Sequence, residues 1–289
     1  MRGLAALVSI GVFAGLVACT TPPSPSAASI PPWQARLGGD AVVLLGEVHD
    51  NAVQHRLRLE ALRRAFAAGW RPAIVMEQFD RERQADIDRA RRERPGDAQH
   101  LIDRAATPAR SPGGGWQWDF YRPFVALVLE HDVPLVAANL SNADAAKIVR
   151  DGYAAVFDAA AMQTLGLDRP IDADWQRAQE REIDAGHCGA LPATMWPRMA
   201  RAQFARDAVM ARALAVHADR GAVLLAGNGH ARRDLGVPRW LALASGRVWS
   251  VGYLEAGDEL TPVAAFDAVA RTSAAERGDP CAAFRGRAP

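Results

Sequence analysis

The sequence predicts an α/β fold in which a mostly parallel central sheet is flanked by helices and carries a smaller, all-helical inserted lobe. Short apolar runs typical of buried strands alternate with stretches of helical periodicity, as in a parallel sheet covered on both faces. Residues 141–218 have helical periodicity and no strand pattern, so they give the lobe. The α/β core is then expected at residues 39–140 and 219–289.

Apolar runs mark the predicted strands. Each is short, and such runs bounded by polar or glycine residues are typical of strands buried on both faces. They are residues 41–45, 73–79, 133–138, 222–226 and 248–254. After the last run the sequence predicts only a polar tail.

Stretches with helical periodicity lie between the predicted strands. Asn51 with Gln54 three residues later is typical of a helix start, and apolar residues then recur at helical spacing. The arginine-rich residues 81–94 indicate a solvated helix. Another helix is expected from about Asp119, with Pro123 in its first turn, where a missing N–H costs little. In the lobe the helical segments are residues 143–157, 173–186 and 193–218.

The amino-terminal segment is predicted to be a targeting signal. Residues 1–18 join a basic start to an apolar run too short for a comfortable permanent span, as in a signal peptide. The run ends in Leu-Val-Ala before Cys19, which resembles the lipobox of a bacterial lipoprotein. Residues 19–38 would then be the lipidated Cys19 and a Pro/Ser-rich tether. With Thr20 after the cysteine, we expect an outer-membrane lipoprotein of the bacterial cell envelope; cleavage without lipidation is the alternative.

Charge and cysteine content narrow the function classes. A net charge of +1 over 289 residues gives no bulk electrostatic case for nucleic-acid binding. Cys188 and Cys281 are the cysteines outside the signal region. In an oxidising compartment they are expected to form a disulfide that ties the carboxyl-terminal tail to the middle of the chain. Two unrelated thiols are the alternative.

Ionisable side chains follow three of the predicted strands. Glu47 and His49 come after the first, Glu77 ends the second, and His230 follows the fourth in a glycine-lined turn. Because parallel strands end along one edge, we expect these four side chains to share one site. They could bind a divalent metal through nitrogen and oxygen, or act as acid and base in hydrolysis. Alternatively, each could be a structural residue or a helix cap.

Five sequence blocks, taken in order, resemble one family. They are GEVHDN, IVMEQFDR, WDFYRPF followed by VPLVAANL, HCGALP, and LLAGNGHARRDLGVPRWL. The blocks resemble the ChaN family of haem-binding bacterial lipoproteins, in the superfamily shared with Tiki proteases and erythromycin-esterase-like hydrolases. The resemblance covers residues 41–254, nearly all of the expected folded part.

The resemblance implies a homodimer that encloses two face-to-face haems. A tyrosine of one subunit would ligate each iron, and a histidine and a lysine of the partner subunit would meet the propionates. Tyr153 is placed first for the haem surface and Tyr121 for the pocket near Glu47, with core packing as the alternative for both. Lys147 and His187 are the propionate candidates. Tyrosinate suits ferric haem, since an anionic oxygen favours oxidised iron.

The leading hypothesis is therefore a lipid-anchored protein that carries haem as cargo in haem or iron acquisition at the bacterial outer membrane. It would act without catalysis of its own, and an outer-membrane haem receptor is an expected partner. The alternative, which leaves enzyme activity open, is a metal-dependent hydrolase of the Tiki or erythromycin-esterase-like type that uses Glu47, His49, Glu77 and His230. A third hypothesis is an envelope protein that binds a partner through the helical lobe.

Overall fold

The computed structural model describes residues 31–108, 115–244, 246–279 and 281–282. The chain divides into two units, residues 1–31 and 32–289, and everything below concerns the second. The predicted signal peptide and Cys19 lie outside the described residues. Within those residues, no helix has the length and apolarity needed to span a bilayer.

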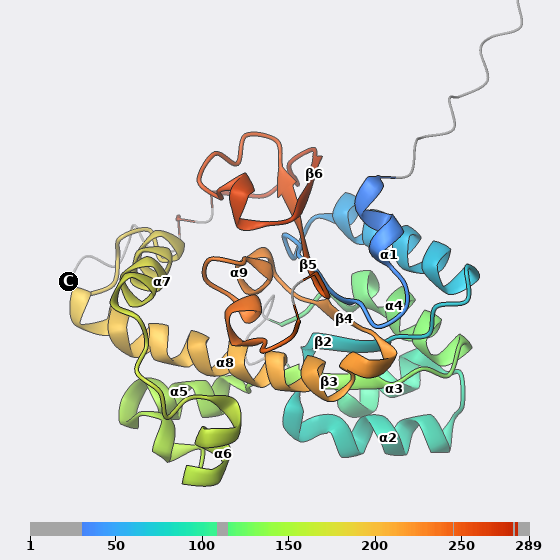
Figure 1. Ribbon diagram of the computed structural model, residues 1–289, viewed down its shortest axis with the longest axis horizontal. Coiled ribbons are helices and arrows are strands. Elements are labelled where there is room, and N and C mark those ends of the chain that lie inside the picture. The colour runs from blue at the N-terminus through green and yellow to red at the C-terminus, as the bar shows by residue number, and fades with distance from the viewer. Residues whose placement is uncertain (1–30, 109–114, 245, 280, 283–289) are drawn as a thin grey trace, which may run out of the picture. The chain divides into compact units, whose positions relative to one another are not determined.

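The centre of the second unit is a parallel sheet with strand order β3-β2-β4-β1-β5-β6 (Figure 1). The strands are β1 (Val42–Leu45), β2 (Ala73–Asp80), β3 (Leu135–Asn139), β4 (Ala222–Leu225), β5 (Val248–Glu255) and β6 (Ala268–Thr272). The predicted fold class is confirmed. Val42 pairs with both Ala222 and Val248, so the carboxyl ends of the central strands lie along one edge.

Strand β6 corrects one prediction. Ala268–Thr272 lies in the stretch expected to be only a polar tail, yet it pairs with β5 at the edge of the sheet. Most of its residues are partly exposed, and only Thr272 is buried. Because an edge strand with exposed side chains needs no continuous apolar run, the pattern used for the other strands could not find it.

Helices cover both faces of the sheet, and further helices form the lobe (Figure 1). They are α1 (Ala52–Ala67), α2 (Gln84–Glu93), α3 (Ala98–Ala105), α4 (Trp118–Glu130), α5 (Asn142–Asp151), α6 (Ala159–Leu165), α7 (Ala173–Gly186), α8 (Trp196–Val216) and α9 (Asn228–Ala231). Alternate residues of a strand point to opposite faces. Val43 and Leu45 pack in the cluster with α1 and α4, while Val42 and Leu44 pack in the cluster with α8.

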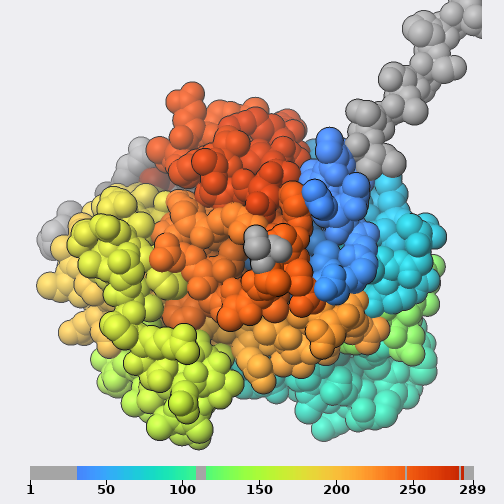
Figure 2. All heavy atoms as spheres, in the orientation of Figure 1, coloured from blue at the N-terminus to red at the C-terminus, as the bar shows by residue number. Residues whose placement is uncertain are grey.

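Helix α8 connects the sheet to the other lobe helices. Met210 and Leu214, near its carboxyl end, pack against the sheet, while Ala202 and Ala205 pack with Ile148 of α5. Between β3 and β4 the structure has helices and no strand. In the space-filling view the lobe helices gather beside the segments that follow β4 (Figure 2). The exact division between core and lobe stays a prediction.

Two helix starts test local predictions. Asn51 caps α1, since its side chain accepts hydrogen bonds from the N–H groups of Val53 (3.1 Å) and Gln54 (3.2 Å). Helix α4 starts at Trp118, however, so Pro123 lies inside the helix and beyond its first turn. The expected position of Pro123 was therefore wrong, and one internal backbone hydrogen bond is missing there.

The carboxyl-terminal tail is fastened at two points. The predicted disulfide between Cys188 and Cys281 is present, with 5.7 Å between the Cα atoms, and joins the tail to the end of α7. Arg277 also donates hydrogen bonds to Asp50 beside β1 and to Glu255 at the end of β5. The tail therefore crosses from the strand ends to the lobe.

Candidate functional site

The four predicted strand-end residues gather around Gly227. Its N–H donates a hydrogen bond of 2.8 Å to Oε2 of Glu77. A methyl group added at Gly227 would lie 3.0 Å from Cε1 of His49 and 3.9 Å from Oε2 of Glu77. Glycine is therefore what lets the two halves of the cluster, Glu47 with His49 and Glu77 with His230, approach each other.

Glu47 is the buried centre of the first half. Its carboxylate forms an ion pair with the fully buried Arg58 and accepts a hydrogen bond from the hydroxyl of Tyr121. The same carboxylate lies 2.8 Å from Nδ1 of His49 and 3.5 Å from Nδ1 of His55. Burial lowers the pKa of Arg58 to about 10, so Arg58 still carries its charge at neutral pH. Tyr121 was expected near Glu47 and contacts it here, whereas Arg58, which comes from helix α1, was not predicted.

His49 is the accessible member of this half. Its side chain is 50% exposed, and its ring meets Trp116 edge-on with 4.8 Å between centroids. With Nδ1 held by the Glu47 carboxylate, the neutral ring has its proton on Nδ1 and its lone pair on Nε2. Nε2 is the ring nitrogen beside Gly227, 3.1 Å from where a Cβ would lie, so His49 is placed to accept a proton there.

His230 holds the second half together. Its Nδ1 lies 2.6 Å from Oδ1 of Asp207 in α8, and its Nε2 lies 3.5 Å from Oε1 of Glu77. Burial alone would lower the pKa of His230, but the charges of Glu77 and Asp207 raise it to about 10. Burial alone would raise the pKa of Glu77, but the charge and hydrogen bond of His230 lower it to about 2. His230 and Glu77 are therefore an ion pair at neutral pH.

Asp207 is, with Arg58, a site residue that the sequence analysis missed. It lies in the lobe helix α8 rather than at a strand end, and it is 3% exposed. A signal was present, because an aspartate lies among apolar residues in the segment ARDAVMARA. A buried carboxylate of this kind needs a partner, and here the partner is His230.

The predicted divalent-metal site is not supported. Among the described residues, no group of three or more His, Cys, Asp or Glu side chains is arranged to hold a metal ion. The reason lies in the hydrogen-bond network. The Glu47 carboxylate is taken up by Arg58 and Tyr121, while the protonated His230 has no lone pair to offer a metal.

The tyrosines differ sharply in accessibility. Tyr121 and Tyr253 are 0% and 1% exposed, and the hydroxyl of Tyr121 is bound to Glu47. Tyr121 therefore packs in the core rather than facing a ligand pocket. Tyr153, in the turn after α5, is half-buried among apolar lobe residues. Its hydroxyl is buried and has no hydrogen-bond partner within the described residues. Burial raises the pKa of Tyr153 to about 12.

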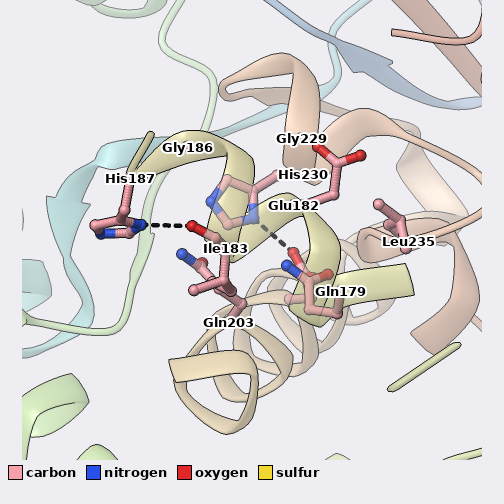
Figure 3. A pocket seen from close by; sticks show the side chains of 10 residues that line it. Gln179, Glu182, Ile183, Gly186, His187, Gln203, Gly229, His230 and Leu235 are labelled. Carbon is pink, nitrogen blue, oxygen red and sulfur yellow. Dashed lines mark hydrogen bonds and ion pairs between the residues drawn. The ribbon is translucent and has the colours of Figure 1, made fainter. Parts of the chain in front are cut away.

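The two propionate candidates lie on different elements. Lys147 is exposed on α5, with Nζ 2.8 Å from Oδ1 of Asp144. His187 ends α7, where its Nδ1–H donates to the carbonyl of Ile183 at 2.7 Å, and it lines a pocket together with His230 (Figure 3). The structure thus brings the four strand-end residues together, whereas Lys147 lies on α5 and His187 directly after α7.

Comparison with known proteins gives a family match and a shared fold. The model of a family described as "Haem-binding uptake, Tiki superfamily, ChaN" matches residues 33–241. The structure of ChaN of Campylobacter jejuni, a protein with cofacial haem binding, has a TM-score of 0.60 at 18% identity, over 81% of this chain and 87% of that one. A mutant erythromycin esterase, EreC, has a TM-score of 0.44 at 14% identity, over 77% and 72%. No curated protein matches the chain.

Proposed function

Because the chain belongs to the ChaN family of haem-binding uptake proteins in the Tiki superfamily, we propose that it is a lipid-anchored haem-binding protein for haem or iron acquisition at the bacterial outer membrane. The observation that carries the proposal is the family match over residues 33–241. The lipobox-like residues before Cys19 and the Pro/Ser-rich tether support the anchor and the location. Haem is cargo in this proposal.

Tyr153 is the tyrosine that the proposal assigns to the haem iron. Of the three tyrosines of the chain, it is neither enclosed like Tyr253 nor bonded to a carboxylate like Tyr121. A buried hydroxyl without a partner costs about 1–3 kcal/mol, and an iron ligated by its oxygen would remove that cost. Bound ferric haem would supply an iron centre that favours an anionic phenolate oxygen.

Lys147 and His187 are proposed to meet the propionates of a haem held by the partner subunit. A lysine is a suitable partner for a carboxylate, and Lys147 is accessible on α5. The same proposal makes the haem-loaded protein a homodimer. It does not require Lys147, Tyr153 and His187 to meet within one chain, since the two subunits contribute to each site.

A hemin titration tests the proposal. The wild-type protein should develop a tyrosinate-type absorbance, and mass determination should show a dimer that carries two haems. Tyr153→Phe should lose this absorbance and bind hemin about tenfold or more weakly, while the matched Tyr121→Phe variant keeps both. Because the pKa of Tyr153 is about 12, a proton must leave on binding, so affinity should rise as the pH is raised through neutrality.

Two different failures can be told apart in this experiment. If the wild-type protein takes up no hemin, haem binding itself is wrong. If hemin binds but Tyr153→Phe retains the wild-type spectrum, only the assignment of the iron ligand is wrong.

A second candidate function is hydrolysis by acid–base catalysis without a resident metal. The favouring observation is the accessible His49, whose Nδ1 is held 2.8 Å from the buried carboxylate of Glu47. In this function His49 would take a proton from water through Nε2, and the charged His230 would stabilise negative charge nearby. Turnover of an activated ester by chelator-treated protein, lost in His49→Gln and retained in His100→Gln, would support it; equal rates in both variants would exclude this role.

A further inference from the structure

A pocket of about 210 Å³ lies between α7, α8 and the turn that carries His230. Figure 3 shows side chains from these elements around the same hollow. Gln179 and Glu182 come from α7, Gln203 and Asp207 from α8, and His230 from α9. The apolar part of the wall includes Ile183 and Leu235.

Two carboxamides line this pocket, and one of them has a buried oxygen without a hydrogen-bond partner among the described residues. Gln179 is 9% exposed, lines the pocket, and has no side-chain hydrogen bond within the described residues. Oε1 of Gln203 is buried and likewise without a partner there. A buried amide oxygen that loses its water without gaining a hydrogen bond is costly. The Gln203 oxygen, with the Gln179 carboxamide in the same pocket, therefore indicates a ligand that bonds to both.

The side chains that surround His230 in this pocket carry more carboxyl groups than positive charges. Glu77 and Asp207 bring two carboxyl groups to His230, which can neutralise only one of them. Burial raises the pKa of Asp207; the His230 charge opposes this shift, and the Glu77 charge adds to it. The Arg206 charge also lowers the pKa of Asp207, but its guanidinium donates a hydrogen bond to Oδ1 of Asn142 rather than to Asp207. One carboxyl group at the inner wall is therefore short of a positive partner.

The rim of the pocket carries negative charge as well. Oε1 of Glu182 accepts a hydrogen bond of 2.7 Å from Arg232, whose other nitrogens bind Asp234. The single guanidinium of Arg232 thus serves two carboxylates. An anionic ligand would meet Asp207 inside and Glu182 at the rim, whereas a cation would be attracted by both.

We propose that this pocket binds a small organic cation with N–H donors, of the amidinium or primary ammonium class, seated against Gln179, Gln203 and Asp207. The N–H groups of such a ligand supply donors for the carboxamide oxygens and a positive charge for Asp207. Its carbon atoms would contact Ile183 and Leu235. The ligand would contact none of the tyrosines considered for the iron, although His187, the propionate candidate, lines the same pocket.

Three probes of nearly equal shape test the charge preference. Acetamidinium, acetamide and acetate are planar molecules that carry a positive, no and a negative charge. In ligand-observed NMR titrations of the full folded protein, acetamidinium should bind about tenfold or more tightly than acetamide, and acetate should not bind. Equal affinities, tighter acetate binding, or no saturable acetamidinium binding would overturn the proposal.

Variants locate the site and its charge. Gln179→Met and Gln203→Met keep side-chain volume but lose the carboxamide, so each should weaken acetamidinium about tenfold, while Gln163→Met on the exposed surface of α6 leaves it unchanged. Asp207→Asn should abolish the preference for acetamidinium over acetamide. If the two pocket glutamine variants bind like the Gln163 control, the probe binds elsewhere and the assignment is wrong. Circular dichroism and urea unfolding check that each variant is folded.

Discussion

Arg58→Met should lower the free energy of unfolding by about 3–5 kcal/mol, because it leaves the buried carboxylate of Glu47 without its positive partner. Arg58 is 0% exposed and its guanidinium contacts the Phe124 ring face, with 5.5 Å from Cζ to the ring centroid. Methionine keeps much of the apolar packing of this side chain. The expected loss is therefore mainly electrostatic, and urea unfolding measured at neutral pH gives its size.

A surface pair and a double variant serve as controls. Arg64 lies 3.6 Å from Glu60 with both side chains about half exposed, so Arg64→Met should cost no more than about 1 kcal/mol. Adding Glu47→Gln to Arg58→Met should recover part of the loss, since the uncompensated charge is then gone. Equal losses for Arg58→Met and Arg64→Met would contradict a buried charge pair at the strand end.

His230→Gln should also cost about 3–5 kcal/mol near pH 5–6, because it leaves Glu77 and Asp207 buried without the imidazolium between them. The pH dependence follows from the two pKa values. Folding lowers the pKa of the Glu77 carboxyl group from 4.5 to about 2. The stability that ionised Glu77 contributes is therefore complete above pH 4.5 and is lost as the pH falls towards 2. Folding raises the pKa of the His230 imidazole from 6.5 to about 10. The stability that charged His230 contributes is therefore complete below pH 6.5 and is lost as the pH rises towards 10.

The difference in unfolding free energy between wild type and His230→Gln should therefore be largest between pH 4.5 and 6.5 and shrink on both sides. Asp207 acts in the opposite sense, since burial raises its pKa and its ionisation costs stability as the pH rises. Urea unfolding of both proteins across the pH range measures the difference. His100→Gln, which alters a pair with Glu93 at the surface, is the control and should show little change. A difference that does not vary with pH would show that His230 is not charged in the folded protein.

Much of the α/β core was predictable because its strands are buried on both faces. In β1 and β4 all four residues are buried, which favours apolar residues at every position, so the run is visible in sequence. Asn51 was predictable for a local reason, since a helix cap depends on residues two and three positions away. The edge strand β6 was not predictable, because most of its residues are partly exposed and need not form an apolar run.

The residues of the candidate site likewise fall into those that the sequence predicts and those that it does not. Glu47, His49, Glu77 and His230 could be found because the strand ends that carry them are readable in the sequence. Of their partners only Tyr121 was expected near Glu47; Arg58 from α1 and Asp207 from the lobe were not found. These contacts join residues that are 11, 74 and 23 positions apart, so no local pattern links them.

By itself, the sequence determined the parallel α/β class, the family and the edge of the sheet where ionisable side chains gather, because burial and strand ends leave short-range patterns. Only the tertiary structure decided which partners those side chains have and which charge states follow. It gave Glu47 a buried cationic partner and placed His230 between two carboxylates, and it left the His49 ring accessible. Charge states depend on burial and on neighbours brought together by folding, and the order of residues along the chain does not contain that distance information.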